Sequence, residues 1–216
     1  MTKNTASKPR LSRAQAKDNT HRALLDAAER CFVKLGYQGA TLDAIAAEAG
    51  FTKGAVYWHF RNKEALFLEL LAHKMEQNAE EAERIVTLLA DHPERLDQEL
   101  GQWFDQFDAR SNAPLLGLEM DFESRRNPSF AALLDEVVRK QRAGVCRILE
   151  RYFELVGRDP PMAVDELTAT MIAIAKAVAL ARQTRHSATL TSATVMRMLL
   201  GMPVSGAEPA RSAAHG

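Results

Sequence analysis

The sequence predicts an all-α fold, with a small N-terminal domain of three helices followed by a larger helical domain. Apolar residues recur at intervals of three and four along most of the chain, which is the period of amphipathic helices. Glycine, proline and asparagine interrupt this pattern at intervals, and the strict alternation that predicts strands is absent. With 216 residues, 46% of them hydrophobic, the chain is long enough to bury a core in each of two domains.

Charge is unevenly distributed along the chain, although the formal net charge is zero. Residues 1–70 contain 11 Lys and Arg against 7 Asp and Glu, whereas residues 71–216 contain 17 against 21. Much of the N-terminal excess lies in residues 1–17, a polar segment that we expect to be disordered. This segment is either a basic arm that follows a phosphate backbone or a solvated tail. A positive N-terminal domain is expected if that domain binds nucleic acid.

The first helix is expected over residues 19–35. Its apolar positions share one face: Leu24, Ala28, Cys31, Phe32 and Leu35. Gly36 then ends the helix, because glycine readily adopts the left-handed conformation of a helix C-terminus. The apolar face should pack behind the two short helices that follow.

Residues 41–63 read TLDAIAAEAGFTKGAVYWHFRNK, which predicts two short helices joined by a tight turn. Thr41 is the N-cap of the first helix, and Gly50 ends it. Its apolar residues follow the i, i+3, i+4, i+7 spacing: Leu42, Ile45, Ala46 and Ala49. Thr52 caps the second helix. Two such helices joined by a glycine turn form a helix-turn-helix.

The second short helix turns Val56 and Phe60 inward and leaves small, basic and aromatic residues outside. A helix that enters the major groove needs small residues near its N-terminus and side chains that reach base edges. We assign base edges to Lys53, Gly54 and Trp58, with packing of Trp58 on a neighbouring helix as the alternative. Phosphate contacts are assigned to side chains that carry hydrogen-bond donors: Thr41, Tyr57, His59 and Lys63. With Thr52, these residues form the predicted DNA-binding set.

Residues 24–67 read LLDAAERCFVKLGYQGATLDAIAAEAGFTKGAVYWHFRNKEALF and resemble the N-terminal domain of the TetR/AcrR family of transcriptional regulators. The resemblance implies a homodimeric repressor that binds an inverted-repeat operator in double-stranded DNA. It also implies release from DNA when a small hydrophobic ligand occupies the second domain. The alternative is a DNA-binding regulator, activators included, that senses no small molecule.

The domain organisation expected from these patterns has four parts. They are a disordered basic arm over residues 1–17, a helix-turn-helix domain over 18–66, a helical ligand-binding and dimerisation domain over 67–201, and a flexible tail over 202–216. A long helix from Lys63 to about Ala90 should link the two folded domains. This helix either transmits a ligand-induced shift to the DNA-binding domain, as the resemblance implies, or is a passive spacer.

Five more helices are expected over residues 96–107, 115–126, 129–156, 163–185 and 190–200, separated by Asn, Pro and Gly. An apolar ligand pocket among them would use aromatic and Met side chains. The candidates are Trp103, Phe104, Phe107, Leu116, Met120, Phe122, Cys146 and Met171, each of which has ordinary core packing as its alternative. Glu119, with Asp121 and Glu123, is either a recognition site for a cation or a solvated face paired with Arg125 and Arg126.

Small residues recur every four positions in the helix expected over 163–185: Ala169, Ala173, Ala177 and Ala181. Such a stripe lets another helix approach closely. The family resemblance places this helix and the last one at a dimer interface, to which Val195, Met196 and Leu199 would contribute. The alternative is a seam inside one protomer.

Other classes of protein are disfavoured by what the sequence lacks. The six histidines form no Glu-x-x-His pair, and neither a phosphate-binding loop nor a nucleophile elbow is present, so we expect no enzyme activity and no cofactor. Cys31 and Cys146 are expected to be reduced core residues, and no metal site is expected. No signal peptide or membrane span is recognised, and we expect a cytoplasmic protein with no membrane partner.

Overall fold

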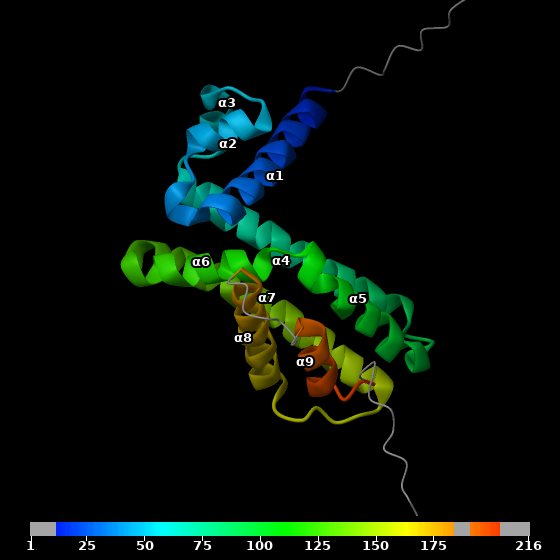
Figure 1. The fold of residues 1–216 in the computed structure, drawn as a ribbon. Coiled ribbons are helices and arrows are strands. Elements are labelled where there is room, and N and C mark those ends of the chain that lie inside the picture. The colour runs from blue at the N-terminus through cyan, green and yellow to red at the C-terminus, as the bar shows by residue number, and fades with distance from the viewer. Residues whose placement is uncertain (1–11, 184–190, 204–216) are drawn as a thin grey trace, which may run out of the picture. The chain divides into compact units, whose positions relative to one another are not determined.

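The computed structural model describes residues 12–183 and 191–203, which are helical throughout their regular structure (Figure 1). The chain divides into two compact units, Met1–Leu70 and Leu71–Gly216. The described helices are α1 (Arg13–Gly39), α2 (Leu42–Ala49), α3 (Lys53–His59), α4 (Lys63–Leu88), a 3-10 turn η1 (Pro93–Arg95), α5 (Leu96–Arg110), α6 (Ala113–Arg126), α7 (Pro128–Val156), α8 (Val164–Gln183) and α9 (Ser192–Leu199). The all-α prediction is therefore confirmed.

Helix α1 begins six residues before its predicted start. Ser12 and Gln15 form a capping box, in which the Ser12 hydroxyl accepts from the Gln15 amide and the Gln15 side chain accepts from the Ser12 amide. The expectation of a disordered segment is thus wrong for residues 13–17, and the rest of the predicted arm, 1–11, lies outside the described residues. Gly36 has φ of 69°, so the chain kinks there as expected before a short helical turn ends at Gly39.

The core of the N-terminal unit is built from aromatic rings and aliphatic side chains of all four of its helices. Phe32 from α1 stacks on Phe67 from α4 with ring centroids 4.4 Å apart, and Tyr37 stacks on the same ring at 4.9 Å. Val56 and Phe60 are buried from the α3 side, as their spacing predicted. Leu35, expected on the buried stripe of α1, is instead 47% exposed, so the buried stripe ends one turn earlier, at Cys31 and Phe32.

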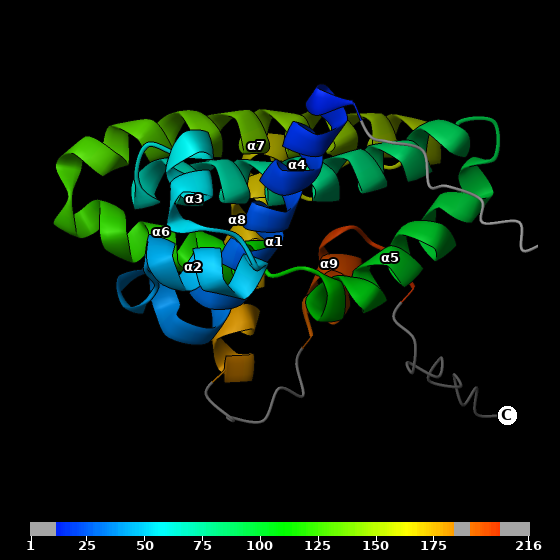
Figure 2. The ribbon, with the colours of Figure 1, turned by 90° about the horizontal axis from the view of Figure 1, so that it is seen from above.

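The C-terminal unit packs α6, α7 and α8 against one another and α5 against α9 (Figure 2). Asn127 caps α7 with its side chain and is followed by Pro128 at the first helical position. Gly157, with φ of 65°, ends the same helix 29 residues later. These breaks lie within two residues of their predicted places because each depends on local backbone chemistry.

The end of the described chain near Met202 and the gap at residues 184–190 concern the predicted tail and the predicted last two helices. Met202 is buried and its amide donates to the Arg197 carbonyl, so residue 202 does not belong to the flexible tail that was expected to begin there. Residues 184–190 and 204–216, which include the predicted end of the 163–185 helix, lie outside the described residues. No helix in the described ranges combines the length and the apolar character that crossing a membrane requires.

Candidate nucleic-acid interface and ligand cavity

Helix α3 turns four residues of the predicted DNA-binding set to solvent: Lys53, Gly54, Tyr57 and Trp58. Tyr57 is 50% exposed and Trp58 is 65% exposed, which is unusual for large aromatic side chains. Val56 anchors the opposite face of α3 in the core, so the outward face is held in one orientation. An exposed face of this kind is what a helix needs to reach into a groove.

Thr41 and Thr52 act as N-caps in the structure. The Thr41 hydroxyl accepts from the Ala44 amide at 3.1 Å, and the Thr52 hydroxyl accepts from the Ala55 amide at 3.3 Å. Each hydroxyl keeps its own hydrogen and a second lone pair, and both residues are exposed. Capping therefore leaves both hydroxyls able to donate to a phosphate.

Lys53 and Trp58 each contact a charged side chain of a neighbouring helix. The Lys53 ammonium lies 2.8 Å from the Asp43 carboxylate, and the pairing raises the pKa of Lys53. The ammonium of Lys17 lies 4.8 Å above the Trp58 ring. Trp58 thus packs on a side chain of α1, which is the second of the two alternatives left open by the sequence, and its contact with base edges stays a prediction. Both contacts are exposed and easily exchanged for contacts to nucleic acid.

His59 belongs to a chain of three polar groups that joins α3, α1 and α4. Its Nδ1 lies 3.2 Å from Nδ1 of His21, and Nε2 of His21 lies 2.5 Å from the Glu69 carboxylate. Burial first, and then the charges of His21 and Lys17, lower the pKa of His59. The imidazole of His59 is therefore neutral near pH 7 and engaged within the protein.

Lys63, which was assigned to a phosphate, is held by the end of α1. Its ammonium donates to the carbonyls of Tyr37 at 2.8 Å and Ala40 at 3.2 Å, and lies 4.3 Å from the Tyr37 ring centroid. Asn62 caps α4 beside it by accepting from the Ala65 amide at 2.8 Å. The structure thus gives Lys63 a second role, as a clamp between α1 and α4.

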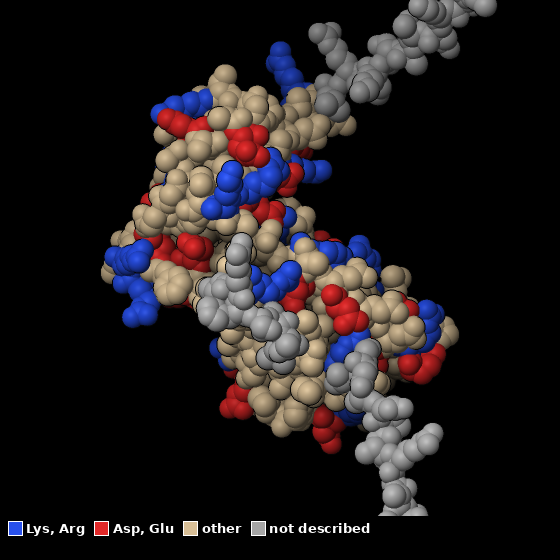
Figure 3. Space-filling view, in the orientation of Figure 1, with Lys and Arg blue, Asp and Glu red and all other residues tan. Residues whose placement is uncertain are grey.

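Surface charge does not by itself mark a binding face on the side of the molecule that Figure 3 draws. On the face drawn in Figure 3, Lys and Arg side chains alternate with Asp and Glu. Ion pairs such as Arg30 with Glu48, 2.6 Å apart, account for part of this mixing. The candidate interface is therefore identified by the exposed face of α3.

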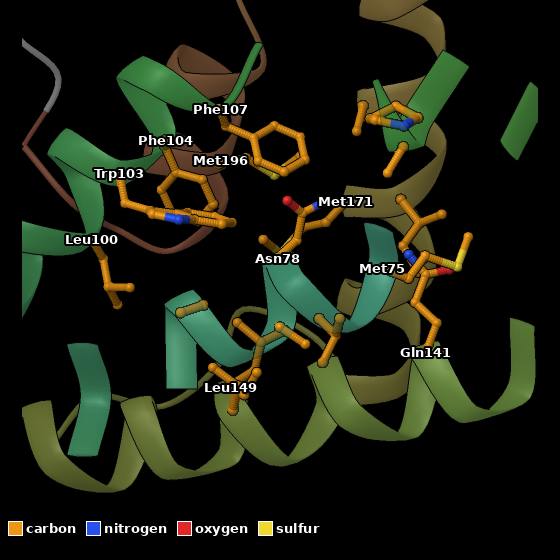
Figure 4. Close-up of a pocket in the computed structure, with 18 of the residues that line it drawn as sticks. Met75, Asn78, Leu100, Trp103, Phe104, Phe107, Gln141, Leu149, Met171 and Met196 are labelled. Carbon is orange, nitrogen blue, oxygen red and sulfur yellow. The ribbon is translucent and has the colours of Figure 1, made fainter. Parts of the chain in front are cut away.

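The C-terminal unit contains an apolar cavity of about 140 Å3. That is roughly ten times the ~10–15 Å3 needed by one water molecule, so the cavity has room for a small organic ligand. Four predicted pocket residues line it: Trp103, Phe104, Phe107 and Met171. Figure 4 shows the three aromatic side chains of α5 gathered at one end and Met75 and Gln141 at the other.

Five predicted pocket residues lie outside the lining, and for these the prediction is corrected. Leu116 and Met120 are fully buried in the core around α6, while Phe122 is 48% exposed. Glu119 is half-buried on the same helix, away from the cavity. The Cys146 thiol lies 3.2 Å from the Thr168 hydroxyl, between α7 and α8. Aromatic and Met side chains do line the cavity, but which face of each helix borders it depends on tertiary packing and not on residue type.

The residues that sequence reasoning missed come mainly from α4 and α7. The further lining residues are Met75, Asn78, Ala79, Ala82, Leu100, Ala113, Pro114, Gln141, Val145, Ile148, Leu149, Tyr152, Ile172, Ala175, Lys176, Met196 and Leu200. The apolar residues that recur at helical spacing through residues 129–156 were the available signal for the α7 part of the lining. Among the described residues, no group of three His, Cys, Asp or Glu side chains is placed to hold a metal ion.

The stripe of alanines on α8 includes exposed positions. Ala173 and Ala177 are exposed, Ala169 and Ala181 are half-buried, and Leu180 beside them is 43% exposed. On α9, Val195 and Leu199 are half-buried and Met198 is 64% exposed. Met196, which was assigned to the dimer interface, is instead buried and lines the cavity. An apolar face on two neighbouring helices is thus open to solvent.

Comparison with known proteins gives a match over the helix-turn-helix and beyond it. The family model described as bacterial regulatory proteins of the tetR family matches residues 24–70. The HTH-type transcriptional repressor Rv1474c of Mycobacterium tuberculosis is 30% identical over 155 residues, which cover 62% of this chain and 76% of that protein. The repressor AcnR of Corynebacterium efficiens is also 30% identical, over 58% of this chain and 65% of its own length, so the alignment spans just under two thirds of that relative.

Solved structures agree in fold. The transcriptional regulator FadR of Bacillus subtilis, solved in complex with stearoyl-CoA, superposes with a TM-score of 0.62 at 20% identity. The superposition covers 87% of this chain and all of that chain. At this identity the likeness concerns the arrangement of helices only.

Proposed function

The chain belongs to the TetR family of bacterial regulatory proteins, and on that premise we propose that it represses transcription by occupying an inverted-repeat operator as a homodimer. It is a transcriptional regulator and not an enzyme. The observation that carries the proposal is the outward face of α3, where Lys53, Gly54, Tyr57 and Trp58 are exposed while Val56 fixes the helix from behind.

Helix α3 enters the major groove in this proposal, with Lys53, Gly54 and Trp58 toward base edges. Gly54 brings the backbone close to the bases because it has no side chain, and the Thr52 hydroxyl lies 3.9 Å from the position its Cβ would take. Thr41, Thr52, Tyr57, His59 and Lys63 surround this face and contact phosphates. His59 and Lys63 do so with the hydrogen-bonding capacity that their internal contacts leave.

Two copies of α3 are required, because one short helix reads too few base pairs for a specific site. The open apolar face of α8 and α9 is the proposed dimer contact, with Ala169, Ala173, Ala177, Ala181, Val195 and Leu199 at its centre. Alanines spaced four apart allow a close approach of two helices. A two-fold dimer then matches an operator whose half-sites lie about one helical turn apart.

A small hydrophobic ligand in the cavity would release the repressor. Helix α4 supplies Met75 and Asn78 to the cavity, and its first turn carries Lys63 in the DNA-binding unit. A ligand that binds better to a conformation with displaced α4 shifts the population away from the DNA-binding form by its difference in affinity. The cavity, the continuous helix and the Lys63 clamp support this route.

The test is binding to operators selected from random DNA by the purified protein. We expect selection of a palindrome. Lys53→Ala should relax the preference at one base pair per half-site, by about 1–3 kcal/mol or roughly 5- to 150-fold. Arg84→Ala, which removes an exposed charge on α4 of the C-terminal unit, is the matched control and should leave the preference unchanged. Equal weakening by Lys53→Ala on operator and random DNA would contradict base contact by α3.

Ligand release is tested separately by thermal shift and operator binding with a panel of small hydrophobic compounds. A ligand bound by the native state raises the unfolding midpoint. We expect compounds that do so to lower operator affinity, and Phe107→Ala to weaken both effects together. A panel in which stabilising compounds leave operator affinity unchanged would contradict the coupling.

A further inference from the structure

Lys176 is the single charged residue among those that line the cavity in the described chain. It projects from α8, and its ammonium lies 2.6 Å from the carboxylate of Asp121 on α6. We propose that the cavity is built for a ligand with an apolar body and one acidic group, and that Lys176 binds the acidic group in place of Asp121. This inference rests on the proposed function of the cavity as an effector site.

The two partners of this ion pair differ in their access to solvent. The Lys176 side chain is 19% exposed, whereas that of Asp121 is 45% exposed, and Asp121 is not part of the lining. Separating them therefore costs little for Asp121, which regains water, but leaves Lys176 short of both water and a counter-charge. An incoming carboxylate supplies that counter-charge from the cavity side, which makes the exchange of partners favourable.

Gly117 on α6 leaves room for the aliphatic stem of Lys176 at the cavity wall. A Cβ at this position would lie 3.1 Å from Cε of Lys176, so the absence of a side chain lets the aliphatic stem pass over α6. The same position lies 4.0 Å from the terminal methyl group of Met75, a lining residue. The ammonium is thus fixed beside the cavity by packing of its stem.

The remaining polar atoms of the lining are largely committed to partners. The Trp103 indole donates to Glu81 at 2.9 Å, and the Tyr152 hydroxyl donates to Asp97 at 2.6 Å. The Asn78 amide donates to Ser111 at 2.8 Å. Lys176, Gln141 and the second N–H of the Asn78 amide remain as donors that can turn toward a ligand. Gln141 and Met75 lie away from the aromatic end formed by Trp103, Phe104 and Phe107 (Figure 4). The stem of Lys176 lies near Met75, because a Cβ at Gly117 would be 3.1 Å from Cε of Lys176 and 4.0 Å from the methyl group of Met75.

This division predicts the shape of the ligand and the order of affinities. A planar apolar body would pack among the aromatic rings, and the acidic group would lie at the end where α8 meets α4 and α7. An uncharged analogue would keep the apolar contacts and lose the ion pair. A cationic analogue would face an ammonium in a confined space and bind most weakly.

Exchange of partners would also alter the packing of the C-terminal unit. Helices α6 and α8 are in contact, and the pair between Lys176 and Asp121 is an ionic link between them. A bound acid removes that link while a neutral ligand leaves it intact. The acidic group is therefore placed to affect the conformation as well as the affinity.

The test uses three probes with the same apolar body, namely naphthalene-2-carboxylate, naphthalene-2-carboxamide and naphthalen-2-ylmethylammonium, titrated calorimetrically into the full-length protein. We expect the carboxylate to bind at least tenfold more tightly than the amide, and the ammonium to bind more weakly than the amide. Lys176→Met should reduce carboxylate affinity to that of the amide while changing amide affinity less than about threefold. Lys176→Gln serves the same purpose if the methionine variant is unstable.

Asp121→Asn is the second test variant. It removes the carboxylate that competes with the ligand for Lys176, so it should strengthen carboxylate binding several-fold. Asp165→Asn breaks an exposed ion pair with Arg142 elsewhere in the same unit and is the matched control, with no change expected. Equal affinities for carboxylate and amide, or a preference for the ammonium, would overturn the assignment while leaving the cavity as an effector site. Failure of all three probes to bind would overturn both.

Discussion

Replacement of Lys63 by methionine separates its two assigned roles, the phosphate contact and the clamp between α1 and α4. Methionine keeps most of the apolar stem but removes the ammonium that donates to the carbonyls of Tyr37 and Ala40. Hydrogen bonds to charged groups contribute about 1.5–3 kcal/mol each, and a cation–π contact about 0.5–1 kcal/mol. Lys63 is half-buried and one of the two bonds is long at 3.2 Å, so we take the lower part of the range. The expected loss is roughly 3 kcal/mol of stability in the N-terminal unit.

Hydrogen exchange measures this loss where it occurs. At about 1.4 kcal/mol per factor of ten, amides of the last turns of α1 and the first turns of α4 should exchange roughly a hundredfold faster in Lys63→Met. Lys53→Met is the control, because its ion pair with Asp43 is more than half exposed on both sides and contributes at most about 1 kcal/mol. Unchanged protection in Lys63→Met, together with a salt dependence of DNA binding lowered by about one unit of slope, would refute the clamp and leave only the phosphate contact.

Further predictions address the cap, the histidine pair, the buried tyrosine and the dimer. Thr52→Ala removes the N-cap of α3, so it should lower the stability of the N-terminal unit by about 1 kcal/mol and weaken operator binding, whereas Thr52→Ser should retain the stability and the affinity. Hydrogen exchange of α3 and operator titration measure these two effects. Burial and the charges of His21 and Lys17 lower the pKa of His59, so the neutral form contributes stability above about pH 6.5 that is lost as the pH falls through the lowered pKa. His59→Gln should make the unfolding midpoint less dependent on pH between pH 8 and pH 5. His92→Gln, at an exposed site, should leave that pH dependence unchanged. Tyr152→Phe removes a hydroxyl that bonds to Asp97 and Arg158 and should destabilise the C-terminal unit by about 1–3 kcal/mol in chemical denaturation, whereas Tyr57→Phe at an exposed ring should be neutral. Ala173→Glu should yield monomers in sedimentation experiments, while Ala132→Glu on an exposed turn of α7 should remain dimeric; a dimeric Ala173→Glu protein would exclude the α8 face.

The helix boundaries were predictable because local chemistry sets them. Asn127 followed by Pro128 starts α7, and Gly157 ends it, whatever the helix packs against. The start of α1 was missed for a local reason as well, since the capping box of Ser12 and Gln15 lies in a stretch whose polar composition resembles a disordered tail. The outward face of α3 was predicted correctly because burial of Val56 and Phe60 fixes where its other residues point.

The cavity was only partly predictable because its lining depends on how separate helices meet. The aromatic residues of α5 were recognised, whereas Leu116 and Met120 have the same apolar character but face the core around α6. The partner of Lys176 lies on another helix 55 residues away, which makes the pair invisible to local patterns. Lys63 shows the same limit, because its carbonyl partners are brought to it only by the kink after Leu35.

Hydroxyl-radical footprinting of the protein on its selected operator tests the central claim most directly. Two copies of the outward face of α3 in successive major grooves predict two equally protected segments whose centres lie about 10 base pairs apart on one side of the duplex. Both should disappear together in Ala173→Glu and when a cavity ligand is added. A single protected segment, or protection that persists unchanged in the monomeric variant, would contradict the claim.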